Sequence, residues 1–172
     1  ADPEGIDYWI SAGTTVKQFA AHMDGQKEWI SVISEKTTTE RINQLYQNLF
    51  NRNADEGGLA YWSNAVDTGV IKLAELGEYL RASALSGDDN EYNDKTILLN
   101  KTAAAVAITA QIRLSVDATN EYKQDSVTPY ISGADFTAAK TFLSEIGVTA
   151  ATATAINAHV ADIAALVDKI TV

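Results

Sequence analysis

The chain has 172 residues, of which 46% are hydrophobic, carries a formal net charge of −10 and lacks cysteine. This length suits one domain, or one domain built from two similar halves. An acidic chain is repelled by the phosphates of nucleic acids and anionic lipids, so it is a poor candidate to bind either. Without cysteine there is no disulfide, thiol nucleophile or cysteine zinc site. No run of eighteen apolar residues occurs, so the sequence predicts no membrane-spanning helix.

The first 36 residues predict short helices separated by glycine. Apolar residues at 6, 9 and 10 share one helical face that ends at Gly13. Thr14 or Thr15 can cap the next helix, which Gly25 ends. A further apolar patch follows and begins with Trp29.

Residues 37–95 predict three helices and an acidic loop. A capping box of threonines 37–39 with Glu40 opens the clearest amphipathic helix, whose apolar face runs from Ile42 to Phe50. A polar turn follows it, and a second helix begins near Leu59 and stops at Gly69. A leucine stripe at positions 73, 76 and 80 predicts the third helix, and the polar loop 87–95 follows.

Residues 96–172 predict a long helix and a helical hairpin. The long helix is expected at 96–114, and its inward face is predicted to be Leu99, Ala103, Val106 and Ala110. The hairpin is expected at 134–146 and from 149 onward, with a turn at Gly147. Its second helix carries a heptad-like seam typical of helix pairing. The seam consists of Ile156, Val160, Ile163, Val167 and Ile170.

A short internal repeat organises the chain. Residues 1–9, ADPEGIDYW, and residues 54–62, ADEGGLAYW, are identical at five of nine positions. A short insertion changes the offset from 53 to 57 and aligns positions 16, 19 and 23 with 73, 76 and 80. The chain starts at the repeated turn, so we expect it to be a fragment that lacks the helix before its first unit.

These patterns predict an all-α, multi-helix domain, since no alternating strand pattern occurs. Two similar turn-helix-helix units, 1–36 and 37–95, are expected to form one part. The long helix and hairpin of residues 96–172 are expected to pack as a tail on it, within one continuous domain.

The second repeat contains a recognisable pattern, LYxxxxxRxxDxxGxxYW. It resembles a helical domain of uncharacterised function found in bacterial surface-layer (S-layer) proteins and in secreted proteins with calcium-binding RTX repeats. The resemblance covers about residues 1–115, including Asn100 and Lys101 in a helix after a polar loop. The pattern consists of Leu45, Tyr46, Arg52, Asp55, Gly58, Tyr61 and Trp62, and the first unit keeps Asp2, Gly5, Tyr8 and Trp9.

The resemblance implies an extracellular location at the cell surface, type I secretion and a structural role. In surface-layer proteins, similar helical regions attach the lattice to lipopolysaccharide. The resemblance thus implies a cell-envelope polysaccharide or lipopolysaccharide as the partner. The second repeat unit, residues 37–95, departs from the pattern at Leu85, where an acidic residue is usual.

Residues of the second turn suit a structural role better than a ligand site. Asp55 can cap the helix that follows it, and Arg52 can bridge to Asp55 or to carbonyls of the preceding helix. Gly58 is expected where helices pack closely or where the backbone angle is unusual. A calcium loop of the EF-hand type is excluded because its sixth and twelfth positions are Glu56 and Trp62.

Two other places are candidates for ligands. The loop with Asp88, Asp89, Asn90 and Asp94 is rich in the oxygens that calcium prefers, although a solvated acidic loop is the simpler interpretation. Calcium is thus a possible ligand, and no cofactor is required. The pairs Tyr61–Trp62 and Tyr8–Trp9 could form an aromatic platform for a sugar, although the tryptophans are expected in the core and the tyrosines to be partly exposed. Trp29 is a further candidate for a partner surface.

No catalytic motif is recognised in the sequence, although its many carboxylates leave the acid pair of a glycosidase open. The two histidines, His22 and His159, have no metal-ligand spacing, and no nucleophile elbow, P-loop or dinucleotide glycine motif occurs. We therefore expect a non-enzymatic module, and the resemblance implies that it anchors a secreted S-layer or adhesin-like protein to envelope polysaccharide or lipopolysaccharide. The alternative is a self-assembly or protein-interaction spacer in a large RTX-type protein, which would bind other copies or domains through the heptad-like seam.

Overall fold

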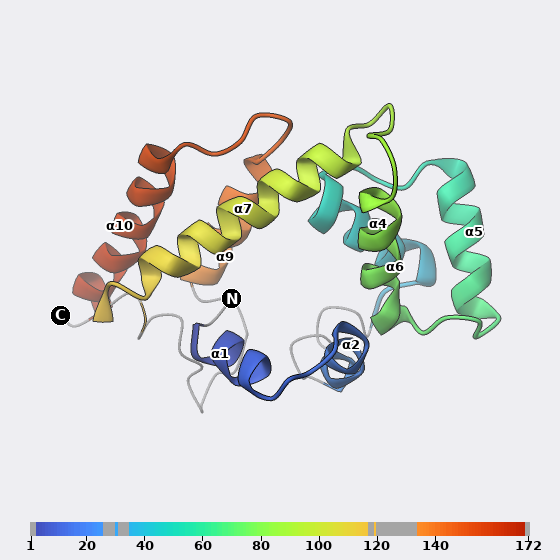
Figure 1. The fold of residues 1–172 in the computed structure, drawn as a ribbon, viewed down its shortest axis with the longest axis horizontal. Coiled ribbons are helices and arrows are strands. Elements are labelled where there is room, and N and C mark those ends of the chain that lie inside the picture. The colour runs from blue at the N-terminus through green and yellow to red at the C-terminus, as the bar shows by residue number, and fades with distance from the viewer. Residues whose placement is uncertain (1–2, 26–29, 31–34, 117–118, 120–133, 171–172) are drawn as a thin grey trace. The chain divides into compact units, whose positions relative to one another are not determined.

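The computed structural model describes residues 3–25, 30, 35–116, 119 and 134–170, and all regular structure in these ranges is helical. This confirms the predicted all-α class. No helix in the described ranges is long and apolar enough to cross a membrane. The helices are α1 (Pro3–Ser11), α2 (Val16–Asp24), α4 (Thr38–Phe50), α5 (Glu56–Asp67), α6 (Leu73–Leu85), α7 (Asp94–Ile112), α9 (Ala134–Glu145) and α10 (Ala153–Ile170) (Figure 1).

The chain divides into two compact units, and the boundary falls within α7. Unit 2 comprises residues 14–98, whereas unit 1 combines residues 1–13 with 99–172. Helix α1 therefore lies with the C-terminal residues and not with α2. One cause is Arg113, whose Nη2 donates to Asp7 Oδ1 at 2.6 Å and to the Pro3 carbonyl at 3.4 Å.

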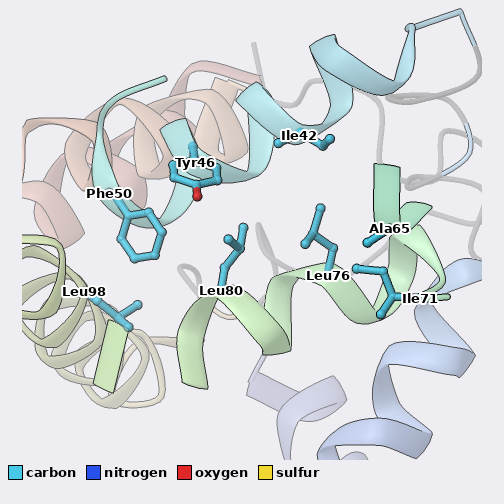
Figure 2. Packing of buried hydrophobic residues seen from close by; sticks show 8 residues of the cluster. All are labelled: Ile42, Tyr46, Phe50, Ala65, Ile71, Leu76, Leu80 and Leu98. Carbon is cyan, nitrogen blue, oxygen red and sulfur yellow. The ribbon is translucent and has the colours of Figure 1, made fainter. Parts of the chain in front are cut away.

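The core of unit 2 is built from the predicted apolar stripes. Figure 2 shows Ile42, Tyr46 and Phe50 of α4 turned toward Leu76 and Leu80 of α6. Ala65, Ile71 and Leu98 complete the buried cluster. Helix α4 places one apolar side chain inward on each turn. The rotation of the helix about its own axis therefore decides which residues of the turn after Phe50 face the core.

Side chains cap the helices of unit 2 where the sequence predicts them. At α4, Glu40 N–H donates to Thr37 Oγ1 at 3.3 Å and Thr37 N–H donates to Glu40 Oε2 at 2.8 Å. Thr15 and Gln18 form the same reciprocal pair at α2. Helix α4 ends at Asn51, which adopts a left-handed backbone conformation with φ of 58°. Asparagine tolerates this conformation better than most residues, and it turns the chain sharply toward α5.

The predicted inward face of α7 is wrong. Leu99, Ala103, Val106 and Ala110 are exposed, whereas the buried positions lie on the other side of the helix. The reason is that α7 has apolar residues on more than one side, so periodicity alone could not select a face. Packing selects it: Leu98 completes the core of unit 2, and Ile108 and Ile112 belong to the core of unit 1.

The heptad-like seam of α10 starts inside the core of unit 1. Ile156 and Val160 are buried in one cluster with Ile108 and Ile112, and Phe142 and Leu143 of α9 pack against it. The side chains of Ile163, Val167 and Ile170 lie outside the described residues. The described part of the seam thus contacts the chain's own helices.

Four helix starts agree with the offsets of the internal repeat, whereas the arrangement in two similar turn-helix-helix units stays a prediction. Helices α1 and α5 begin at residues 3 and 56, an offset of 53, and α2 and α6 begin at residues 16 and 73, an offset of 57. Packing at these equivalent positions differs. Val16 and Phe19 are exposed on α2, whereas Leu76 is fully buried on α6. The same local pattern therefore serves two different environments.

Lys101 is a buried charge on α7, with only 8% of its surface exposed. Burial lowers its pKa from 10.5 to about 8, because the ammonium ion loses hydration when it leaves water. The adjacent Asn100 donates its Nδ2 to the carbonyls of Gly147 and Val148 at 3.0 and 2.9 Å, which attaches α7 to the turn after α9.

We predict that Lys101→Met changes how stability depends on pH. Between about pH 8 and the ordinary lysine pKa of about 10.4, the unfolded chain binds more protons at this side chain than the folded chain does. The free energy of unfolding of the wild type should therefore rise with pH relative to Lys101→Met, by at most about 1.4 kcal/mol per pH unit. Urea unfolding at pH 7, 8.5 and 9.5 measures this, with the exposed Lys140→Met as control. A difference between wild type and Lys101→Met that does not vary with pH would contradict it.

Candidate functional site

The residues of the repeated pattern meet at the junction of α4 and α5. Trp62 Nε1 donates to Tyr46 Oη at 3.2 Å, which joins the last residue of the pattern to the buried tyrosine of α4. Burial is the main cause that raises the pKa of the Tyr46 hydroxyl above its ordinary value. The tryptophan is half-buried against the core of unit 2. This pair holds α5 against α4.

Gly58 is required by a close approach and not by its backbone angle. A Cβ atom at this position would lie 3.0 Å from Tyr46 Oη and 3.4 Å from both carboxylate oxygens of Asp55. The N–H of Gly58 donates to Asp55 Oδ1 at 2.8 Å, so Asp55 caps α5 as predicted. This hydrogen bond is the main reason that the pKa of Asp55 is lowered. The close-packing interpretation of Gly58 is therefore confirmed.

Arg52 connects this junction to the start of α7. Its Nε donates to Asp94 Oδ1 at 2.8 Å and its Nη2 to Asp94 Oδ2 at 2.6 Å, which is a bidentate ion pair. Its Nη1 donates to the Asn53 carbonyl at 3.0 Å and lies 3.6 Å from Asp55 Oδ2. The predicted bridge to Asp55 exists, but Asp94, 42 residues away, is the stronger partner.

Two tyrosine rings enclose the guanidinium of Arg52. Its carbon lies 4.1 Å from the ring centroid of Tyr92 and 5.0 Å from that of Tyr46. A guanidinium between aromatic faces gains cation–π attraction as well as packing. The hydrogen-bonded ion pair with Asp94 is the main cause that raises the pKa of Arg52. The Arg52 side chain therefore stays positively charged.

The acidic loop folds around the N-terminus of α7. Asp89 accepts hydrogen bonds from the backbone N–H groups of Lys95 at 3.0 Å and Thr96 at 3.1 Å. Asn90 Oδ1 accepts from the N–H groups of Tyr92 and Asp94 at 3.0 and 3.1 Å. These side chains satisfy the amide groups that a helix start leaves unbonded. Hydrogen bonding, first from the Thr96 side chain, lowers the pKa of Asp89.

These contacts bear on the predicted calcium ligands. Asp94 already accepts from Arg52 and from Asn90 Nδ2, Asp89 serves as a helix cap, and Asp88 is exposed. Among the residues that the structure describes, no three acidic or histidine side chains converge to hold a metal ion. A calcium ion bound by all four predicted ligands would have to share Asp94 with Arg52. Calcium binding at Asp88, Asp89, Asn90 and Asp94 stays a prediction.

Tyr61 lies where a ligand could reach it. Its side chain is 65% exposed, and its ring packs edge-on against Trp62 with centroids 4.8 Å apart. The ring of Trp62 also contacts the ring of Tyr79 in α6, with centroids 6.3 Å apart, and Tyr79 is 46% exposed. We name Tyr61, Trp62 and Tyr79 the aromatic cluster. The other predicted ligand residue, Trp29, lies outside the described residues.

A shallow polar depression lies along α4, and sequence reasoning missed it. Its amides bond to one another and to neighbours: Gln47 Nε2 donates to Asn53 Oδ1 at 2.9 Å, and Lys36 Nζ donates to Gln44 Oε1 at 3.0 Å. His22 belongs to unit 2, and His159 of unit 1 stacks on Phe142. The depression is lined by Lys36, Glu40, Asn43, Gln44, Gln47 and Asn53.

Sequence reasoning also missed the partners of the pattern residues. The pairing of Arg52 with Asp94 and the contacts of Tyr92 and Tyr79 join segments that are distant in the chain. The sequence signal for the partner of Arg52 was Asp94, the acidic residue at the start of α7, which was interpreted as a calcium ligand instead.

We predict that Arg52→Lys destabilises unit 2 although it keeps the positive charge. Lysine cannot make the bidentate pair or fill the space between two rings, so a loss of about 1–3 kcal/mol in the free energy of unfolding is expected. Arg81→Lys is the matched control, because Arg81 makes a similar bidentate contact with Glu78 on the exposed side of one helix. That change should cost at most about 1 kcal/mol. Equal losses for both variants in urea unfolding would refute the role assigned to Arg52.

Comparison with known proteins places part of unit 2 in context. No curated protein and no solved structure matches the chain. Residues 20–78, which contain the whole of the LYxxxxxRxxDxxGxxYW pattern, match the family model described as Domain of unknown function (DUF4214). The expected resemblance to an uncharacterised domain family is thereby confirmed for this segment, whereas its surface-layer and RTX context stays a prediction.

Proposed function

We propose that the chain is a non-enzymatic cell-surface module of a secreted protein and that it binds cell-envelope polysaccharide. The observation that carries the proposal is the exposure of the aromatic cluster. The other described residues of the pattern bond or pack inside the fold, as Tyr46, Arg52 and Asp55 do. Tyr61 is the pattern residue whose side chain faces mostly solvent.

The chemistry of the cluster suits a sugar. A tyrosine ring offers a flat apolar face to the C–H groups of a pyranose, and its hydroxyl both donates and accepts hydrogen bonds. The rings of Tyr61 and Tyr79 each contact the half-buried Trp62. These ring contacts limit the motion of both tyrosine side chains. Restrained aromatic side chains lose little entropy on binding.

The net charge of the chain restricts which glycans it can bind. A net charge of −10 repels phosphorylated glycolipid, so a neutral O-polysaccharide is the favoured ligand. A calcium ion at the acidic loop would be a second way to bring an anionic glycan to the surface. Surface-layer context and export by type I secretion remain part of the proposal through the family resemblance.

A second candidate function is protein interaction, and the exposed face of α7 favours it. Leu99 and Val106 are exposed on this helix and are separated by two helical turns. Exposed apolar side chains aligned on one helix are typical of contact surfaces. The seam of α10 supports this candidate less than expected, because Ile156 and Val160 are already buried.

We predict that the chain is retained by purified lipopolysaccharide bearing O-polysaccharide, and that Tyr61→Ala weakens retention about tenfold, which corresponds to about 1.4 kcal/mol. Val70→Ala, an exposed apolar change away from the rings, should leave binding unchanged. Each pull-down is run with and without EDTA. Loss with EDTA would indicate a calcium bridge, and no retention in either condition would refute anchoring.

For the second candidate, Val106→Glu should abolish any concentration-dependent association, because it places a charge in the exposed stripe of α7. Light scattering measures the mass of the wild type and the variant at about 1 to 100 µM. This range covers the dissociation constants of weak protein contacts. A wild type that stays monomeric over this range would refute self-assembly.

A further inference from the structure

The aromatic cluster depends on one indole ring. Trp62 contacts Tyr61, its neighbour on α5, with ring centroids 4.8 Å apart, and Tyr79 of α6, with centroids 6.3 Å apart. The two tyrosines belong to different helices, and the indole is the ring that they share. A rotation of Trp62 would therefore change the positions of both exposed rings relative to each other.

A hydrogen bond to the core restricts the rotation of this indole. Trp62 Nε1 donates to Tyr46 Oη at 3.2 Å. The acceptor is itself held in place, since the buried ring of Tyr46 packs edge-on against Phe50 with centroids 5.5 Å apart. The guanidinium carbon of Arg52 lies 5.0 Å from the same ring. Because hydrogen bonds prefer a nearly linear arrangement of donor, hydrogen and acceptor, a fixed acceptor limits how the indole can turn.

The fold keeps room for the hydroxyl of Tyr46. A phenylalanine ring at this position would fill the same space in the core, so the hydroxyl serves the contact with Trp62 and not the packing. A Cβ atom at residue 58 would lie 3.0 Å from Tyr46 Oη. Gly58 occupies that position within α5, although glycine is unfavourable inside a helix relative to alanine. Helix propensity is thus given up next to the acceptor of Trp62.

We infer that Tyr46 is a positioning residue of the proposed glycan site, because its hydroxyl holds Trp62 in the orientation that sets Tyr61 and Tyr79 for binding. This inference rests on the proposed function and adds a buried residue to its site. Tyr46 is only 6% exposed, so it acts through Trp62 and does not touch the ligand. Aromatic rings that are already held in their binding conformation lose less entropy when a sugar binds.

The variant that tests this role is Tyr46→Phe, which removes the hydroxyl and keeps the ring against Phe50 and Arg52. We expect it to bind purified O-polysaccharide about threefold to tenfold more weakly than the wild type, which is the range that one neutral hydrogen bond covers. Tyr92→Phe is the matched control, because the ring centroid of Tyr92 also lies close to the Arg52 guanidinium, at 4.1 Å. The control should bind as the wild type does. Calorimetry measures the affinity of each protein.

A second measurement follows Trp62 directly. In nuclear magnetic resonance spectra of isotope-labelled protein, the indole N–H signal of Trp62 is assigned by its loss in Trp62→Phe. This proton should exchange with solvent faster in Tyr46→Phe than in the wild type, whereas Tyr92→Phe should leave its exchange unchanged. A purely structural role of Tyr46 would lower the free energy of unfolding but leave the affinity of the folded protein unchanged.

The outcomes separate this inference from the proposed function. A Tyr46→Phe variant that binds the polysaccharide as tightly as the wild type, or that leaves the Trp62 indole signal unchanged, would overturn the positioning role. An equal loss of affinity in Tyr92→Phe would overturn it too, because the effect would then not act through Trp62. Failure of the wild type to bind the polysaccharide would overturn the proposed function itself. Urea unfolding establishes that each variant is folded under the conditions of the binding measurement.

Discussion

The bidentate pair between Arg52 and Asp94 is the interaction on which the architecture of unit 2 depends. It joins the turn after α4 to the first residue of α7, across 42 residues of sequence. Only arginine fits, since it must satisfy two carboxylate oxygens in one plane while lying between two tyrosine rings. A half-buried charge pair of this kind is costly to break, because the remaining charge would lack its partner. The position of the loop before α7 follows from it.

The residues around this pair explain the repeated pattern in physical terms. Tyr46 uses its ring against Arg52 and its hydroxyl as the acceptor for Trp62, so one side chain serves two contacts. A Cβ atom at Gly58 would lie 3.0 Å from that hydroxyl, so a side chain there would push Tyr46 away from its contact with Trp62. The pattern is therefore mainly a set of fold-forming contacts, which directs the search for function to the rings that remain exposed.

Unit 1 shows a different constraint. Helix α7 has apolar residues on more than one side, so it can contribute Leu98 to one core and Ile108 and Ile112 to another. Burial of Lys101 costs hydration, but the same face of the helix also buries Leu98, Ile108 and Ile112, whose burial is favourable. The face that this choice leaves exposed is the apolar stripe on which the second candidate function depends.

Local chemistry made much of this protein predictable from the sequence. Capping residues such as Thr37 and Asp55, glycine breaks and the stripe from Ile42 to Phe50 depend on neighbours a few residues away, so the all-α class and most helix positions followed from spacing alone. The tertiary structure alone decided which face of α7 is buried and gave Arg52 its partner. It also placed α1 in the unit of the C-terminal helices. These outcomes depend on contacts between distant segments, for which periodicity within a single helix carries no information.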